Sequence, residues 1–210
     1  MKSVLISIKP KWCELIVSGK KTVEVRKTKP KLETPFKVYI YCTKQGKQFF
    51  HGGIGEKECL FKNPDTEKIK FDYAFELMCC KNEYTKDNFL SGKVIGEFVC
   101  NKIEDYSKFE YDYNALLRHI ALWAGTKDYF FLDSYLGGEK CCYGWHISNL
   151  VIYDKPRELS EFKRDCDGNC QTCKNAVWRT NGWACEPYIV GCLPIKRPPQ
   201  SWCYVESESQ

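Results

Sequence analysis

The sequence predicts a mixed α+β fold, mainly β, in which a small β-barrel carries flanking helices and a cysteine-rich insert. Five or six segments have the length and apolar content of strands, whereas one or two have the spacing of an amphipathic helix. With 210 residues, 43% of them hydrophobic and 28% charged, the chain is long enough for one well-filled core. We therefore predict a single domain over residues 1–210.

The first elements form a strand–helix–strand unit. Leu5 to Ile8 has strand character, and Pro10 suits the first turn of a helix, where its missing N–H costs nothing. Gly19 stands where a helix often ends on a residue in the left-handed conformation. The inner face of this helix is predicted to carry Trp12, Leu15 and Ile16.

The later elements follow from β-branched and aromatic runs and from turn residues. Residues 44–91 have weak periodicity and are predicted to be an insertion or a long hairpin. The other elements are strands over residues 36–43, 92–106 and 143–159, a helix over 112–124 that offers Leu116, Leu117, Ile120 and Leu122 for packing, and a final strand after Pro198 and Pro199.

The segment "SGKKTVEVRK" (18–27) is the first candidate for a functional surface. Side chains alternate along a strand, so Val23 and Val25 point to one face, while Thr22, Glu24 and Arg26 point to the other. A solvated edge strand and a polar functional face are both compatible with this pattern.

The formal net charge of +5 is unevenly distributed. Residues 1–47 contain twelve Lys or Arg and three Glu, whereas the remainder of the chain is net negative. Such a basic region suits a phosphate-bearing partner, although lysines can also serve solubility alone. No apolar run reaches the length of a signal segment or a membrane span, so we expect a cytoplasmic protein without a membrane partner.

The segment "GKKTVEVR" has the form G-x-K-x-x-E-x-R through Gly19, Lys21, Glu24 and Arg26, and this form resembles the signature of ASCH domains. The segments "GKVIGEF", "YGWHISNL" and "RPPQSWCYVE" are similar to parts of bacterial and phage ASCH proteins. The resemblance covers the whole chain. It implies a PUA-like β-barrel, a cleft lined by the signature residues, and binding of RNA or nucleotides.

The chemistry of the signature residues fits such a ligand. Arg26 offers a planar fork of donors, Lys21 a point charge, and Glu24 orients both cations. The ligand is therefore predicted to be RNA, another single-stranded nucleic acid or a nucleotide. Aromatic residues that could stack on a base, each with core packing as its alternative, are Trp12, Tyr41, Trp145 and Trp202.

A hydrolase is the alternative function. Small members of the same superfamily act as amidohydrolases on acetylated cytidine, using the signature lysine, a further glutamate, and a threonine at the position of Glu24. A glutamate there can act as a base or an ion-pair partner but not as the same acyl nucleophile. The alternative is thus a ribonuclease or amidohydrolase that acts on RNA or a modified nucleoside, with Lys21 and Glu24 as catalytic residues.

Fourteen cysteines occur in the chain, and residues 163–195 form a cysteine-rich insert. Cys166, Cys170 and Cys173 have C-x3-C-x2-C spacing, which lets thiolates converge on one metal ion. We predict a structural zinc site completed by Cys192, with Cys185 as the other candidate. An iron–sulfur cluster fits less well, because radical enzymes with this spacing need a larger barrel. Free or redox-active thiols are the remaining alternative.

Overall fold

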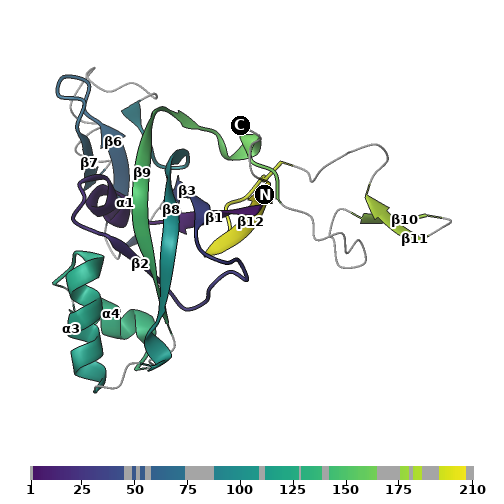
Figure 1. Cartoon of the computed structure of the whole chain (residues 1–210). Coiled ribbons are helices and arrows are strands. Elements are labelled where there is room, and N and C mark those ends of the chain that lie inside the picture. Colours follow the sequence, from purple (N-terminus) through teal and green to yellow (C-terminus); the bar gives the residue numbers. More distant parts are fainter. Residues whose placement is uncertain are drawn as a thin grey trace.

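The structure is a computed structural model (Figure 1). It describes residues 2–44, 49–50, 53–54, 58–73, 88–108, 112–127, 129–138, 142–164, 176–179, 182–185 and 194–206.

One curled six-stranded sheet forms the centre of the fold. Its strands, in spatial order, are β12 (Trp202–Glu206), β1 (Lys2–Ile8), β3 (Phe36–Cys42), β8 (Val94–Asp105), β9 (Tyr143–Arg157) and β2 (Val23–Arg26). β1 and β3 run parallel, and the other neighbours are antiparallel. The mainly-β prediction is confirmed. In the described part of the chain the sheet is a half-barrel, with β12 and β2 at its edges, rather than a closed barrel.

The predicted strand–helix–strand opening is confirmed. Helix α1 (Pro10–Val17) begins at its proline, and Gly19 follows the helix with a φ of +73°. The predicted inner face is partly wrong, because α1 buries Pro10, Cys13 and Ile16 while Trp12 and Leu15 are half-buried. Residues three apart share one face of a helix, and this series faces the main core on β1, β3 and β8.

Helices α3 (Tyr113–Ala124) and α4 (Tyr129–Leu136) lie together at one end of the sheet (Figure 1). Asp112 caps α3 by accepting a 2.8 Å hydrogen bond from the Ala115 amide. Leu116, Leu117 and Ile120 are buried as predicted, but Leu122 is 73% exposed, because it lies on the face of α3 that turns away from α4 and β2. Helix α4 has no counterpart in the sequence prediction.

The two predicted insertions contain short antiparallel hairpins. Residues 44–91 hold β4 (Phe49–Phe50), β5 (Gly53–Ile54), β6 (Glu58–Lys62) and β7 (Ile69–Tyr73), and the β6–β7 pair contacts α1. The cysteine-rich insert holds β10 (Ala176–Arg179) and β11 (Gly182–Cys185). The predicted zinc ligands Cys166, Cys170, Cys173 and Cys192 lie outside the described residues. None of the helices in the described ranges is long and apolar enough to cross a membrane.

Candidate functional site

A cavity of about 940 Å³ opens beside the end of β2 that carries Glu24 and Arg26. Six secondary-structure elements (β1, α1, β2, β3, α3 and α4) and the loop before β12 contribute to its walls, so residues far apart in the chain meet there. The residues that line it include Ser7, Lys9, Trp12, Lys21, Glu24, Arg26, Tyr41, Lys44, Ser134, Tyr135 and Pro199.

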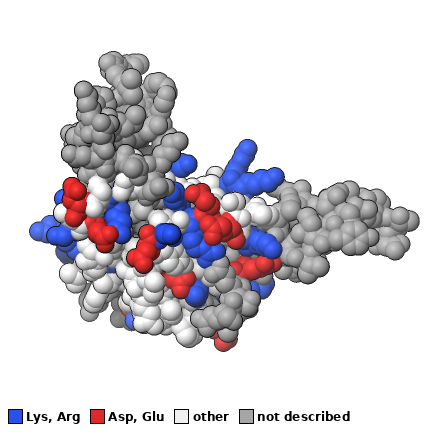
Figure 2. Space-filling model, turned by 90° about the horizontal axis from the view of Figure 1, so that it is seen from above, with Lys and Arg blue, Asp and Glu red and all other residues white. Residues whose placement is uncertain are grey.

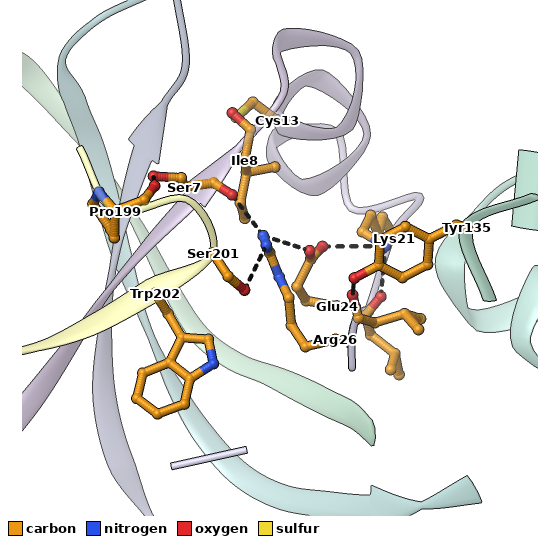
Figure 3. A network of polar contacts seen from close by, with 12 residues as sticks. Ser7, Ile8, Cys13, Lys21, Glu24, Arg26, Tyr135, Pro199, Ser201 and Trp202 are labelled. Atoms are coloured by element: carbon orange, nitrogen blue, oxygen red, sulfur yellow. Dashed lines mark hydrogen bonds and ion pairs between the residues drawn. The ribbon is translucent and has the colours of Figure 1, made fainter. Parts of the chain in front are cut away.

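Glu24 stands between two cations in the cavity wall (Figure 3). Its Oε2 atom lies 3.3 Å from Nζ of Lys21, and its Oε1 atom lies 2.9 Å from Nη2 of Arg26. All three side chains are at least nine-tenths buried. Buried charges require partners, and this arrangement pairs both cations with one carboxylate. The interpretation of this segment as a solvated edge strand is therefore wrong, although β2 is an edge strand of the sheet.

Arg26 connects β2 with the opposite side of the half-barrel. Its Nη2 atom donates a 2.6 Å hydrogen bond to the carbonyl oxygen of Ser7, and Nη1 donates one of 3.3 Å to Oγ of Ser201. The Ser7 hydroxyl in turn donates to the carbonyl oxygen of Pro199, at 2.7 Å. The loop before β12 is thereby held over the polar network (Figure 3).

Lys21 is fixed by three groups of different kinds. Besides the Glu24 carboxylate, its ammonium donates a 2.8 Å hydrogen bond to the carbonyl oxygen of Val23 and lies 5.5 Å from the centre of the Trp12 ring. Burial lowers the pKa of Lys21 below its ordinary value of 10.5, and the Glu24 carboxylate opposes that shift. The cavity therefore contains an amine that loses its proton more easily than an exposed lysine.

The end of α3 positions the residues before β2. The Thr22 amide donates a 3.1 Å hydrogen bond to the carbonyl oxygen of Trp123. Gly125 ends α3 with a φ of +65°, and a Cβ atom there would lie 2.4 Å from the carbonyl oxygen of Lys20. Only a residue without a side chain allows this close approach, so Gly125 sets the position of the backbone that carries Lys21.

Helix α4 supplies a wall of the cavity that sequence analysis missed. Tyr135 and Ser134 line the cavity, and the Tyr135 hydroxyl reaches the carbonyl oxygen of Val25 at 3.5 Å. Burial raises the pKa of Tyr135, so its hydroxyl stays protonated. The run "YFFLDSYLGG" held a signal for this helix, because an apolar segment that ends in a glycine pair is typical of a helix C-terminus.

The sequence model of the ASCH domain family matches residues 6–153, which is more than half of the chain and includes the segment from Gly19 to Arg26. The chain belongs to the ASCH domain family. The resemblance seen in the G-x-K-x-x-E-x-R segment is thus confirmed at the level of the family.

Solved structures of another ASCH protein are similar in fold. The crystal structure of ASCH from Zymomonas mobilis is 18% identical, with 98% of this chain and 89% of that chain covered and a TM-score of 0.51. A Tyr-to-Phe variant of that protein is 19% identical over 76% of this chain and 77% of that chain, with a TM-score of 0.45. No curated protein matches the sequence. At this identity, the first structure supports the ASCH fold alone.

In this ASCH domain the predicted ligand-binding residues fall into two groups. Lys21, Glu24, Arg26, Trp12 and Tyr41 line the cavity. The others do not, and they are Gly19, Trp145 and Trp202.

The residues outside the cavity have structural positions. Gly19 forms the turn after α1. Trp145 is fully buried in the main core. The rings of Phe36 and Trp145 pack edge to face, and the centre of the Trp202 ring lies 6.0 Å from that of Trp145. The prediction that Trp145 stacks on a base is therefore wrong. Trp202 packs against Tyr204 and donates a hydrogen bond to Thr28. In the antiparallel register Trp145 is opposite Glu24, so the two side chains share one face of the sheet, where Trp145 belongs to the main core.

The ASCH domain presents no group of three or more metal-ligating side chains within the described ranges. The predicted zinc ligands lie outside those ranges, so the zinc site stays a prediction.

Proposed function

We propose that this ASCH domain binds RNA or a nucleotide in the cavity beside β2. ASCH domains are generally thought to bind RNA. The observation that carries the proposal is that one cavity combines aromatic rings with the Lys21–Glu24–Arg26 network.

The size and lining of the cavity support a nucleotide-sized ligand. About 940 Å³ lies at the upper end of the range of small-molecule sites. Trp12 is half-buried and offers part of its ring to a base, and the half-buried Tyr135 adds aromatic surface, whereas Tyr41 lines the cavity with only 5% of its surface exposed. The lining also includes four cations and one carboxylate, namely Lys9, Lys21, Arg26, Lys44 and Glu24. This excess of positive charge suits a phosphate.

The proposal is tested by titrating the four nucleoside monophosphates and short RNA and DNA strands into the protein at low salt. Trp12→Ala should raise the dissociation constant about tenfold, because stacking on one aromatic ring contributes roughly 1–3 kcal/mol per base. Trp123→Ala is the matched control, since Trp123 is 42% exposed and does not line the cavity. Absence of binding to every nucleotide and strand, or equal effects of the two variants, would overturn the proposal.

Hydrolysis of RNA or of a modified nucleoside is a second candidate, favoured by one observation. Lys21 and Glu24 lie 3.3 Å apart in the cavity, and burial lowers the pKa of Lys21, which makes it a better proton carrier near neutral pH. Thr22 is exposed and does not line the cavity. This candidate therefore uses Lys21 and Glu24 in acid–base roles, without a threonine nucleophile.

We also propose that the cysteine-rich insert holds one structural zinc ion through Cys166, Cys170, Cys173 and Cys192. The support is the spacing of the cysteines and the low apolar content of the segment between Lys163 and Asn175. The ion stabilises the insert and takes no part in ligand binding in the cavity.

A further inference from the structure

We infer that the ligand is a single strand of nucleic acid rather than a free nucleotide, and that the strand leaves the cavity along the loop after β2. The inference rests on the proposed function and names the substrate class of that site. Its evidence is a row of three lysines, Lys27, Lys29 and Lys31, which we call the lysine row.

The lysine row begins where the cavity ends. Arg26 is the last residue of β2 and lines the cavity, and Lys27 follows it directly with an exposed side chain. Lys29 and Lys31 are also exposed, at two-residue intervals. Two residues of extended chain span roughly 7 Å, which is the scale on which phosphates follow one another in an unstacked strand. The loop thus offers about one cation for each phosphate of a bound nucleic-acid strand.

Aromatic side chains position the lysine row. Nζ of Lys27 lies 5.6 Å from the centre of the Tyr135 ring, and Tyr135 lines the cavity. Nζ of Lys29 lies 4.9 Å from the centre of the Tyr143 ring. A cation over an aromatic face is held without losing its charge, so both ammonium groups remain able to attract phosphate. Lys27 therefore marks the rim of the cavity.

The loop is anchored on both sides of Lys29, through the Thr28 side chain and the Lys31 backbone. Nε1 of Trp202 donates a 3.0 Å hydrogen bond to Oγ1 of Thr28, and the Lys31 amide donates one of 2.7 Å to the Tyr204 hydroxyl. Pro30, between these contacts, is buried. Four hydrogen-bonding groups and one buried ring hold the loop along the edge strand β12, so a bound strand meets a preformed surface.

Acidic neighbours do not neutralise the lysine row. Among the described residues, no carboxylate lies within ion-pair distance of its three ammonium groups. Hydrogen bonds from Ser107 lower the pKa of Asp105 most, and Lys29 adds a smaller contribution without forming an ion pair with it. Glu33 follows the row and is exposed.

The face of the molecule drawn in Figure 2 carries charges of both signs. In Figure 2, which is seen from above, Lys and Arg side chains lie interspersed with Asp and Glu side chains. A mixed surface of this kind has no large area of one sign and gives a strand no continuous path. The lysine row, in contrast, is a run of one sign that starts at the cavity.

The test compares two triple variants. One replaces Lys27, Lys29 and Lys31 by Gln, and the matched control replaces Lys62, Lys68 and Lys70 of the β6–β7 hairpin by Gln, for the same change in net charge. Each protein is titrated with a mixed-sequence RNA of about 12 nucleotides and with the four nucleoside monophosphates, between about 50 and 200 mM salt.

The lysine-row variant should bind the RNA at least tenfold more weakly than the wild type at low salt. The slope of log K against log salt should fall by about 2, because each lost phosphate contact on a single strand accounts for about 0.7. The affinity for the monophosphates should fall much less than the affinity for the RNA, because only Lys27 of the row stands at the rim of the cavity, and the control variant should match the wild type with both probes.

Three outcomes separate the possibilities. If the wild type binds neither probe, the proposed function fails and the inference with it. If the wild type binds a monophosphate as tightly as the RNA, or if the lysine-row variant keeps the RNA affinity, the inference is overturned while the cavity keeps its proposed function. Equal losses in the two variants would also overturn the inference, because they would reflect total charge rather than a path.

Discussion

Arg26 and Ser7 join two strands that are not neighbours in the sheet. Nη2 of Arg26, on the edge strand β2, donates a 2.6 Å hydrogen bond to the carbonyl oxygen of Ser7 on β1, which lies beside the opposite edge strand. The half-barrel is therefore bridged at this point by a side chain instead of a ladder of backbone hydrogen bonds. The cavity lies at the same place, so the residue that bridges the sheet is also part of the candidate site.

Glu24→Gln should destabilise the protein by roughly 2–4 kcal/mol, because the substitution leaves two buried cations without a carboxylate. Chemical denaturation measures this change. The same variant separates the candidate functions: a binding domain should retain measurable affinity, whereas an enzyme that uses Glu24 as its base should bind substrate and lose turnover. Unchanged turnover of a confirmed substrate would exclude the base role.

Binding of an anionic nucleotide should weaken as the pH rises toward 10.5. The charged form of Lys21 attracts phosphate, and burial lowers its pKa, so the ammonium is lost below the pH at which an exposed lysine loses its proton. Affinity measured between pH 7 and about 10 should fall in the wild type and fall less in Lys21→Arg, which keeps its charge. Parallel pH profiles for the two proteins would contradict this role of Lys21.

Gly125→Ala should be more destabilising than Gly137→Ala. Both glycines have a positive φ, +65° and +69°, so both substitutions incur roughly 1 kcal/mol of backbone strain. At Gly125 the new methyl group also meets the carbonyl oxygen of Lys20 at 2.4 Å, whereas nothing lies within 4 Å at Gly137. We expect a further 1–3 kcal/mol or so at Gly125 in thermal unfolding. Equal losses of stability in the two variants would show that the close approach of Gly125 to the Lys20 carbonyl oxygen does not constrain the fold.

Glu104→Gln should lower stability at neutral pH by about 1 kcal/mol and have less effect in acid. Burial alone would raise the pKa of Glu104, but Lys102, with Nζ 2.6 Å from Oε1, and His146, with Nε2 3.2 Å from Oε2, outweigh it and lower the pKa to about 2. A carboxylate with a lowered pKa stabilises the fold above its unfolded pKa of about 4.3. That contribution is lost as the pH falls toward 2.

Unfolding of Glu104→Gln and the wild type at several pH values therefore gives a difference that shrinks between about pH 4.3 and pH 2. The control is Glu67→Gln, since Glu67 is 79% exposed and its pair with Lys62 is 3.6 Å long. This control should match the wild type throughout. If Glu104→Gln lowered the free energy of unfolding equally at every pH, the loss would come from altered packing and not from the charge of Glu104.

Protein purified without chelators should contain about one zinc ion per chain. Cys170→Ser should release the metal and leave the six-stranded sheet folded, as judged by metal analysis and thermal unfolding. Cys203→Ser is the control, because Cys203 is a free cysteine on β12, outside the insert. A metal content near zero would refute the zinc site. Iron with visible absorbance would show that the insert holds an iron–sulfur cluster instead of zinc. A site that uses Cys185 instead of Cys192 would correct the ligand set.

Local chemistry determined the first part of the fold. Pro10 and Gly19 mark the two ends of α1, because a proline fits the first turn and a glycine adopts the left-handed conformation without strain. The alternation around Glu24 predicted a strand, and the G-x-K-x-x-E-x-R spacing predicted the family. Each of these signals depends on residues within a few positions of one another, so one sequence suffices to read them.

Tertiary structure alone decided which candidate residues reach the cavity. The sequence treats Trp12 and Trp145 alike, yet Trp12 lines the cavity and Trp145 fills the core, because Phe36 and Trp202 cover it. The burial of Arg26 depends on Ser7 and Ser201, the second of which is 175 positions away. Periodicity shows which side chains share a face of a strand, but the segments packed against that face come from distant parts of the chain. Only folding of the whole chain brings those segments together.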